Sequence, residues 1–253
     1  MKLAKIKQNG EIFWAADVEN NFYKLQETPY HEIAVTNEIV NGEFKYLPPC
    51  DPSKIIGLAY NYKSLVGKND GFDEPLVFLK GLNALVGHKD NVLYPTFATK
   101  VWIEVELAVV IKDIAKNITV KDVADVILGY TIGNDITTGN IHNRDHHLAR
   151  SKSLDTFCPV GPYLWTDIDP THLEIKSMIN DQVTQEGNTA DMILNAFECV
   201  ACASQYFTLL PGDIILTGTT ANAMNSIVIP GDRVELTIEN FESLNNNIVE
   251  DMK

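Results

Sequence analysis

Basic residues are scarce in this chain, and their scarcity argues against several classes of function. The 253 residues include 20 lysines and arginines against 34 aspartates and glutamates, which gives a net charge of −14. Nucleic acids and anionic membrane surfaces are bound through basic patches, so the composition argues against both as partners. A protein this acidic that handles an anionic substrate must gather positive charge locally, through a metal ion and a few lysines or arginines.

Long apolar runs are missing as well. No run in the sequence approaches the roughly 20 residues that are needed to span a bilayer. The opening segment, MKLAKIKQNG, lacks the apolar stretch of a signal peptide. We therefore expect a cytoplasmic protein without a membrane partner.

Cysteine is also infrequent, and its spacing excludes a disulfide framework. Of the four cysteines, Cys199 and Cys202 form a C-x-x-C pair inside the apolar helical pattern at residues 194–207. No second pair or nearby histidine completes a zinc site. We interpret the pair as thiols of a buried helix, with a redox motif as the alternative.

Two glutamates interrupt the apolar stretch WIEVELAVVI at residues 102–111. Side chains on an extended strand repeat direction every second residue, so Glu104 and Glu106 share one face. We expect this strand to be half buried, where two unpaired like charges are costly and a positive group belongs between them. The alternative interpretation is the solvated face of an amphipathic strand.

A third carboxylate follows on the next strand pattern. The apolar run at 127–135, ILGYTIGND, ends in Asp135, and Lys152 lies a little further along. A capping-box pattern at 119–122 predicts a short helix between the two strands, which returns the chain so that Asp135 meets the two glutamates. Three oxygen ligands without a nearby Cys favour a hard cation over structural zinc: Mg²⁺ or Mn²⁺, with Ca²⁺ able to take the same place in a crystal.

A series of short motifs runs in order along about residues 51 to 250. They are FLK at 78–80, IEVEL at 103–107, GYTIGND at 129–135, SKSLDTF at 151–157, GNT at 187–189 with DMI at 191–193, and LPGD at 210–213 running into LTGT at 216–219. Each motif is weak alone, but the ordered series resembles the fumarylacetoacetate hydrolase family. More specifically, it resembles the bacterial branch of 2-hydroxyhepta-2,4-diene-1,7-dioate isomerases, acylpyruvate hydrolases and oxaloacetate decarboxylases.

The resemblance implies an α+β fold of packed mixed β-sheets with few short helices. It also implies a homodimer with the active site near the interface. Short alternating strand patterns and turn residues at 1–50 predict a small β-rich N-terminal element, which opens with a hairpin around Gly10. Prolines at 48, 49 and 52 mark its end, because consecutive prolines continue neither a helix nor a central strand. We therefore predict a family-like catalytic domain over residues 51–253.

The resemblance also assigns roles to individual residues. The three carboxylates would hold the metal, and Lys152 would act beside it at the reaction centre. Lys80, in the family motif FLK, would point into the pocket for an anion rather than extend outward to solvent. Thr219, the second threonine of T-G-T, would approach the substrate carboxylate.

The chain departs from its relatives in the segment that follows residue 57. Many relatives carry Arg-Asn-Tyr there, followed by a His and a Glu that close over the substrate and activate water. The matched positions in this chain are Leu58, Ala59, Tyr60, Lys63 and Val66, so only the tyrosine is retained. Tyr60 and Lys63 are candidates for substrate binding, with an exposed surface lysine as the alternative for Lys63.

A second departure lies between Asp135 and Lys152. Relatives often carry an Arg and a Gln where this chain has Gly139 and His142. His142 is our hypothesis for a replacement proton carrier, because histidine titrates near neutral pH. On a helix His142 and His146 would share a face, but no third ligand supports a second metal site.

Three carboxylates on one divalent ion leave about three of six octahedral positions open, enough for a bidentate 2-oxo acid and a water. Such a site stabilises the enolate that forms when a bond to C3 breaks, so it serves tautomerisation, decarboxylation or C–C hydrolysis. Hydrolysis also needs a base for water, and the usual His and Glu are missing. We expect first a divalent-metal-dependent isomerase or decarboxylase of a 2-oxo or 2-hydroxy dicarboxylate, of the 2-hydroxyhepta-2,4-diene-1,7-dioate or oxaloacetate type. An acylpyruvate- or fumarylacetoacetate-type C–C hydrolase comes next, and a catalytically weak metabolite-binding member third.

Overall fold

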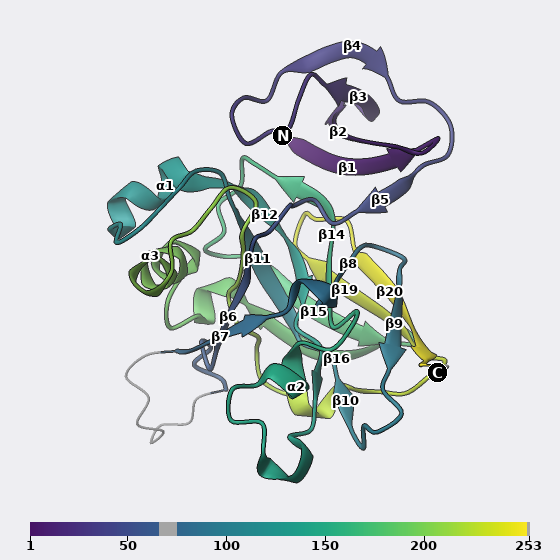
Figure 1. The fold of residues 1–253 in the computed structure, drawn as a ribbon, viewed down its shortest axis with the longest axis vertical. Helices are drawn as coiled ribbons and strands as arrows, with labels where there is room; N and C mark the ends of the chain where they lie inside the picture. Colours follow the sequence, from purple (N-terminus) through teal and green to yellow (C-terminus); the bar gives the residue numbers. More distant parts are fainter. Residues whose placement is uncertain (66–74, 252–253) are drawn as a thin grey trace.

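The computed structural model describes residues 1–65 and 75–251, in which β-strands form most of the regular structure (Figure 1). Within these residues the strands form sheets of twelve, five and three strands, with both parallel and antiparallel pairs. This confirms the expected α+β arrangement of mixed β-sheets with few short helices. No helix of the described residues is long and apolar enough to cross a membrane.

The twelve-stranded sheet runs through the middle of the molecule. Its strands are β1 (Lys2–Gln8), β2 (Glu11–Val18), β3 (Asn21–Leu25), β4 (Val35–Ile39), β5 (Lys45–Leu47), β6 (Ile55–Ala59), β7 (Leu76–Lys80), β8 (Leu85–Val86), β11 (Val105–Ile111), β12 (Ile127–Asn134), β14 (Cys158–Trp165) and β17 (Ile214–Leu216). Their order is β4-β3-β2-β1-β14-β12-β11-β17-β6-β7, with β5 beside β1 and β8 beside β14.

The two smaller sheets complete the strand structure. The five-stranded sheet contains β9 (Asn91–Tyr94), β15 (Glu174–Ile179), β16 (Gln182–Asn188), β19 (Arg233–Ile238) and β20 (Leu244–Glu250), in the order β16-β15-β19-β20-β9. The three-stranded sheet consists of β13 (Thr137–Thr138), β10 (Val101–Trp102) and β18 (Ile227–Val228), with β10 in the middle.

The helices are short, as expected. The α-helices are α1 (Val123–Val126), α2 (Ala149–Lys152) and α3 (Ala196–Tyr206), and the 3₁₀ helices are η1 (Leu82–Ala84), η2 (Val120–Asp122), η3 (Ile141–Asn143), η4 (Thr189–Asp191) and η5 (Ala223–Asn225).

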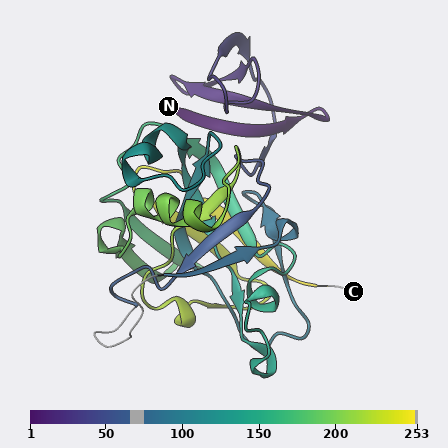
Figure 2. The ribbon, with the colours of Figure 1, turned by 60° about the vertical axis from the view of Figure 1, so that its left-hand side comes forward.

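The N-terminal strands project from one end of the molecule (Figures 1 and 2). β1 and β2 form the predicted hairpin, with Lys2 opposite Asp17 and Gln8 opposite Glu11. The strands have a small apolar cluster of their own, but β1 also pairs with β14 and so continues the large sheet. The division between residues 1–50 and 51–253 stays a prediction.

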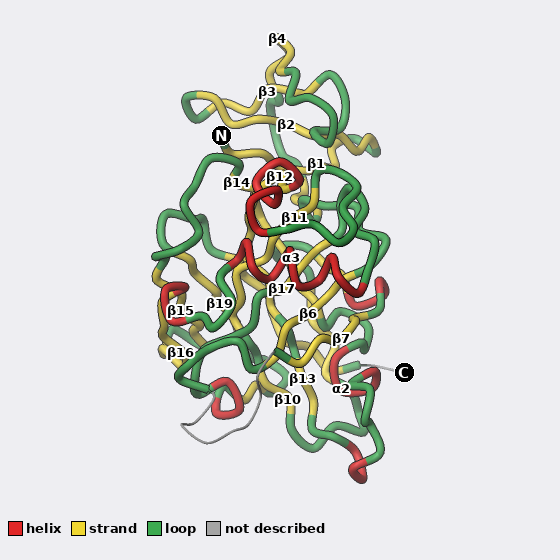
Figure 3. Tube along the Cα trace, turned by 90° about the vertical axis from the view of Figure 1, so that its left-hand side faces the viewer, coloured by secondary structure: helices red, strands yellow, loops and turns green. Residues whose placement is uncertain are grey.

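Strand β11 lies in the interior and carries the apolar stretch that drew attention in the sequence. All seven of its residues are buried. β12 and β17 flank the strand within the sheet, and α3 (Figure 3), β15 and β19 pack against it. The expectation of a half-buried strand was therefore wrong. A strand covered on both faces reads as a nearly continuous apolar run, which is what LAVVI is.

Capping residues set the ends of the short helices. The predicted capping box between Thr119 and Asp122 is confirmed, and it opens η2 just before α1. The apolar helical pattern at 194–207 forms α3, which begins at Ala196. Asn195 caps α3 by accepting the N–H groups of the next turn, and Asn188 caps η4. A side-chain oxygen that accepts these otherwise unpaired N–H groups fixes where a helix begins.

Candidate active site

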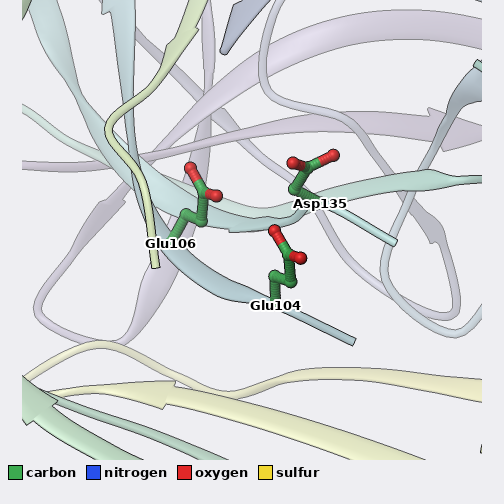
Figure 4. A group of neighbouring side chains, drawn as sticks. All are labelled: Glu104, Glu106 and Asp135. Carbon is green, nitrogen blue, oxygen red and sulfur yellow. The ribbon is translucent and has the colours of Figure 1, made fainter. Parts of the chain in front are cut away.

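Three carboxylates meet at one end of the β11/β12 pair (Figure 4). Glu106 lies in β11 opposite Gly133 of β12. Glu104 directly precedes β11 and Asp135 directly follows β12, and the Asp135 N–H donates to the Glu104 carbonyl at 3.0 Å. One ligand oxygen from each carboxylate lies within 4.8 Å of the others.

The burial of these carboxylates excludes the interpretation of a solvated strand face. Glu104 is 9% exposed, Glu106 2% and Asp135 1%. An ionised carboxylate in such surroundings is costly unless it is paired or binds a metal. The cluster therefore has to be held in place by positive charge.

Two buried lysines supply part of that charge. Lys80, the last residue of β7, places its Nζ 2.5 Å from Asp135 Oδ1. Lys152, the last residue of α2, places its Nζ 3.0 Å from Glu104 Oε2 and also contacts Asp135. The Lys152 ammonium lies 5.0 Å from the centroid of the Phe78 ring as well. The structure thus brings both predicted lysines to the carboxylates.

Asp145, which the sequence reasoning missed, holds α2 in position. Its buried carboxylate accepts the Ser151 N–H at 2.6 Å and the Arg150 N–H at 3.1 Å, and the Ser151 hydroxyl also donates to it. The helix of Lys152 is therefore tied down at its N-terminal side. Asp145 stands six residues before Ser151 rather than at a cap position, so no local pattern identified it.

The carboxylates differ in how their surroundings shift their acidity. Burial, and then the nearby charges of Asp135 and Glu104, raise the pKa of Glu106 well above its usual range. Burial also raises the pKa of Glu104. Burial would raise the pKa of Asp135 too, but Lys152 and Lys80 outweigh it and lower that pKa. Full ionisation of all three groups calls for more positive charge than the lysines supply.

A glycine provides the backbone donor to Glu106. The Gly218 N–H donates to Glu106 Oε2 at 2.6 Å. Gly218 has φ of +93°, and a Cβ there would lie 2.7 Å from the carbonyl oxygen of Leu58. Only glycine fits this close, left-handed turn, which explains the glycine between the two threonines of T-G-T.

Thr219 lies beside the cluster with its hydroxyl engaged within the protein. The hydroxyl donates to the Val105 carbonyl at 2.9 Å and accepts from Gln185 Nε2 at 3.0 Å. A hydroxyl has one proton, and that of Thr219 is donated to Val105. In this arrangement the Thr219 hydroxyl can therefore only accept a hydrogen bond from a ligand. Gln185, which is 1% exposed on β16, escaped the sequence reasoning. The role of Thr219 toward a substrate carboxylate stays a prediction.

Tyr60 and Lys63 lie at the end of β6, away from the interior. Tyr60 is 43% exposed with a φ of 62°, and the Lys63 side chain is exposed. Val66 lies outside the described residues. The Asn61 side chain between them was missed: it is fully buried, and its amide donates to the carbonyls of Leu194 and Thr217 at 2.8 Å each. Substrate contact by Tyr60 and Lys63 stays a prediction.

His142 has an exposed side chain within η3. Its φ of 55° breaks the helical geometry, so the helix on which His142 and His146 would share a face does not form. No hydrogen bond found within residues 1–65 and 75–251 joins His142 to the carboxylates. Its role as a proton carrier stays a prediction.

Comparison with known proteins places the chain in a family. Residues 54–249 match the model described as fumarylacetoacetate (FAA) hydrolase C-terminal. The chain belongs to this fumarylacetoacetate hydrolase family. The resemblance inferred from the ordered motifs is therefore confirmed.

Solved structures of this family resemble the chain over its full length. The 2-hydroxyhepta-2,4-diene-1,7-dioate isomerase of Mycobacterium marinum is 34% identical, with a TM-score of 0.90 over 100% of both chains. The 5-carboxymethyl-2-hydroxymuconate delta-isomerase of Mycobacterium smegmatis is 32% identical, with a TM-score of 0.91 over 99% of this chain and 100% of that one. The maleylpyruvate hydrolase of Sphingobium sp. SYK-6, solved with manganese(II) and pyruvate, is 26% identical, with a TM-score of 0.81 over 100% of both chains. The isomerases and hydrolases among these similar structures support the conclusion that this chain is an enzyme.

The donors of this family member fit a divalent cation. The cluster offers carboxylate oxygens alone, all buried and close enough to share one ion. Hard cations such as Mg²⁺ and Mn²⁺ prefer such oxygen ligands, whereas zinc sites usually include Cys or His. Burial and the neighbouring carboxylates raise the pKa of Glu106, and a bound cation would favour its ionised form.

Proposed function

We propose that this protein is a divalent-metal-dependent isomerase or decarboxylase of a 2-oxo or 2-hydroxy dicarboxylate, of the 2-hydroxyhepta-2,4-diene-1,7-dioate or oxaloacetate type. The observation that carries the proposal is the buried cluster of Glu104, Glu106 and Asp135 with the ammonium groups of Lys80 and Lys152 against it. The three carboxylates would hold Mg²⁺ or Mn²⁺, and the lysines would meet the anionic substrate.

The residues divide the work of an enolate-forming reaction. A bound divalent ion supplies electrophilic stabilisation of negative charge that develops on the C2 oxygen of the substrate. Lys152 serves as a donor of charge and hydrogen bonds rather than as a base: burial would lower its pKa, but Asp135 and Glu104 outweigh burial and raise it. Lys80 holds Asp135 from the other side, which keeps the carboxylate oriented.

Two observations favour isomerisation or decarboxylation over hydrolysis. The His and Glu that activate water in many relatives are absent from the positions we matched to them. The isomerases of M. marinum and M. smegmatis are also closer in sequence and structure than the Sphingobium hydrolase. The hydrolase, solved with the 2-oxo acid pyruvate, keeps acylpyruvate-type C–C hydrolysis as the second candidate.

The test is substrate consumption by metal-stripped protein with and without added Mg²⁺ or Mn²⁺. The substrates are oxaloacetate, 2-hydroxyhepta-2,4-diene-1,7-dioate and an acylpyruvate. We expect metal to restore loss of CO₂ or migration of the double bond. Glu106→Ala should reduce that rate by at least about 100-fold. Loss of a residue that only hydrogen-bonds a metal ligand costs up to about 100-fold, and loss of a ligand itself should cost at least as much. Glu174→Ala, at an exposed side chain on β15, is the matched control.

The other outcomes select other functions. Acylpyruvate cleavage alone would make the C–C hydrolase the better proposal. Tight metal binding without turnover of any of the three substrates would favour the metabolite-binding member. A homodimer and a cytoplasmic location accompany the proposal as predictions, to be checked by molecular mass in solution and by cell fractionation.

A further inference from the structure

The two oxygens of the Glu104 carboxylate have different partners. Oε1 accepts the indole N–H of Trp102 at 2.7 Å and lies 3.3 Å from the hydroxyl of Thr137. Oε2 accepts from the Lys152 ammonium at 3.0 Å. The carboxylate is thus held on one oxygen by neutral donors and turned with the other toward the lysine and the cluster.

Trp102 is the main donor on that held side. The Thr137 hydroxyl has one proton, and its shorter contact, 3.0 Å, is to the Asp135 carbonyl. The indole N–H of Trp102 has no other function than to donate, and it cannot lose its proton at ordinary pH. Trp102 therefore offers Glu104 the same donor whatever the cluster binds.

The three-stranded sheet gives Trp102 a fixed place. Trp102 lies in the central strand β10, opposite Thr137 of β13 on one side and Ile227 of β18 on the other. Its side chain is 9% exposed. The sheet thereby places both donors to Oε1 on adjacent strands, next to the metal-binding end of β11.

We propose that Trp102 is a positioning residue for the metal site. Its N–H holds Glu104 through Oε1, so that Oε2 is the oxygen presented to the cation. The inference rests on the proposed function, because it requires a divalent ion on the three carboxylates. Partners of this kind orient ligands and commonly change metal affinity by about 10- to 100-fold when they are lost.

The test compares Mn²⁺ dissociation constants of metal-stripped variants by titration calorimetry. Trp102→Phe keeps an aromatic ring and removes the N–H, and we expect it to weaken Mn²⁺ binding by about 10- to 100-fold. Trp165→Phe is the matched control, because Trp165 stacks on Phe241 and pairs with Lys2 of β1 in the N-terminal part of the sheet. Thr137→Val should weaken binding less than Trp102→Phe, and Thr137→Ser should restore it.

A spectroscopic signature separates positioning from general loss of structure. With Trp14 and Trp165 replaced by Phe, Trp102 is the remaining tryptophan of the chain. Its emission should change on addition of Mn²⁺ along the same curve as the calorimetric binding. A structural role alone would lower the urea midpoint without altering Mn²⁺ affinity.

Each result decides the matter. Equal Mn²⁺ affinity of Trp102→Phe and the unsubstituted protein overturns the inference and leaves the proposed function standing. Equal weakening by Trp102→Phe and Trp165→Phe overturns it too, since the effect would then be global. Failure of the unsubstituted protein to bind Mn²⁺ or Mg²⁺ overturns the proposed function and this inference together.

Discussion

Two buried acidic centres in this protein are built in opposite ways. Asp213, whose side chain is fully buried, accepts from five donors on its two oxygens. They are the N–H groups of Ser53, Lys54 and Leu210, the Ser53 hydroxyl and the Lys54 ammonium. In the described chain, Glu106 has one hydrogen bond, from the Gly218 N–H, and lies close to two further carboxylates.

The difference separates a carboxylate kept for structure from one kept for chemistry. Asp213 has its lone pairs saturated by Leu210 and by Ser53 and Lys54, which directly precede β6, so it has little capacity for a ligand. The cluster carboxylates are buried at comparable depth with fewer donors and with mutual repulsion. Such an arrangement is costly for folding and suits a cation.

Removing the saturated carboxylate should have the largest effect on stability. Asp213→Ala leaves the N–H groups of Ser53, Lys54 and Leu210 without their acceptor, at about 1–3 kcal/mol for each group that stays desolvated. These hydrogen bonds are only partly buried, so we expect the free energy of unfolding to fall by about 3 kcal/mol, the lower end for three such groups. Urea unfolding measures this loss of stability. Asp213→Asn, which keeps an acceptor oxygen, should lose less, and a loss below about 1 kcal/mol for Asp213→Ala would contradict the comparison.

Neutralising a cluster carboxylate should have the opposite sign. Glu106→Gln keeps an acceptor for the Gly218 N–H and removes the repulsion from Asp135 and Glu104. We expect the free energy of unfolding of the metal-free protein to rise by about 1–2 kcal/mol, as when a strained buried charge is replaced. Mn²⁺ affinity should fall in the same variant. Lower stability of metal-free Glu106→Gln would show that the cluster is structural after all.

The sequence predicted this contrast only in part. Strand periodicity and turn chemistry are local properties, so the hairpin at the N-terminus, the capping box at 119–122 and the convergence of Glu104, Glu106 and Asp135 could be read from residue spacing. Burial is not local. β11 is covered on both faces by α3 and by strands that come much later in the chain, and its apolar run alone did not indicate this.

The partners of the site residues were harder to predict. Trp102 and Gln185 act through contacts that depend on the pairing of distant strands, as does the pairing of β1 with β14. His142 was selected for its titration near neutral pH, yet the backbone turns at that residue and leaves the side chain exposed. Residue type identified what chemistry is present, whereas tertiary packing decides which groups take part in it.

A half-buried base extends the same comparison and should give the smallest effect. His88 Nδ1 accepts the Asn245 N–H at 3.2 Å, and burial, helped by Lys89, lowers the pKa of His88 to about 4. The unfolded chain titrates near its usual value of about 6.5, so between these values the unfolded state binds more protons. Stability should therefore decline as pH falls from about 6.5 toward 4.

His88→Asn keeps an acceptor and should flatten that part of the profile, measured by urea unfolding against pH. Its overall stability should drop at every pH because the edge contact with Tyr46 is lost. His31→Asn, at an exposed position, should keep the original slope. An unchanged slope in His88→Asn would contradict His88 as the source of the acid sensitivity, because the raised pKa values of Glu104 and Glu106 favour the folded state as pH falls.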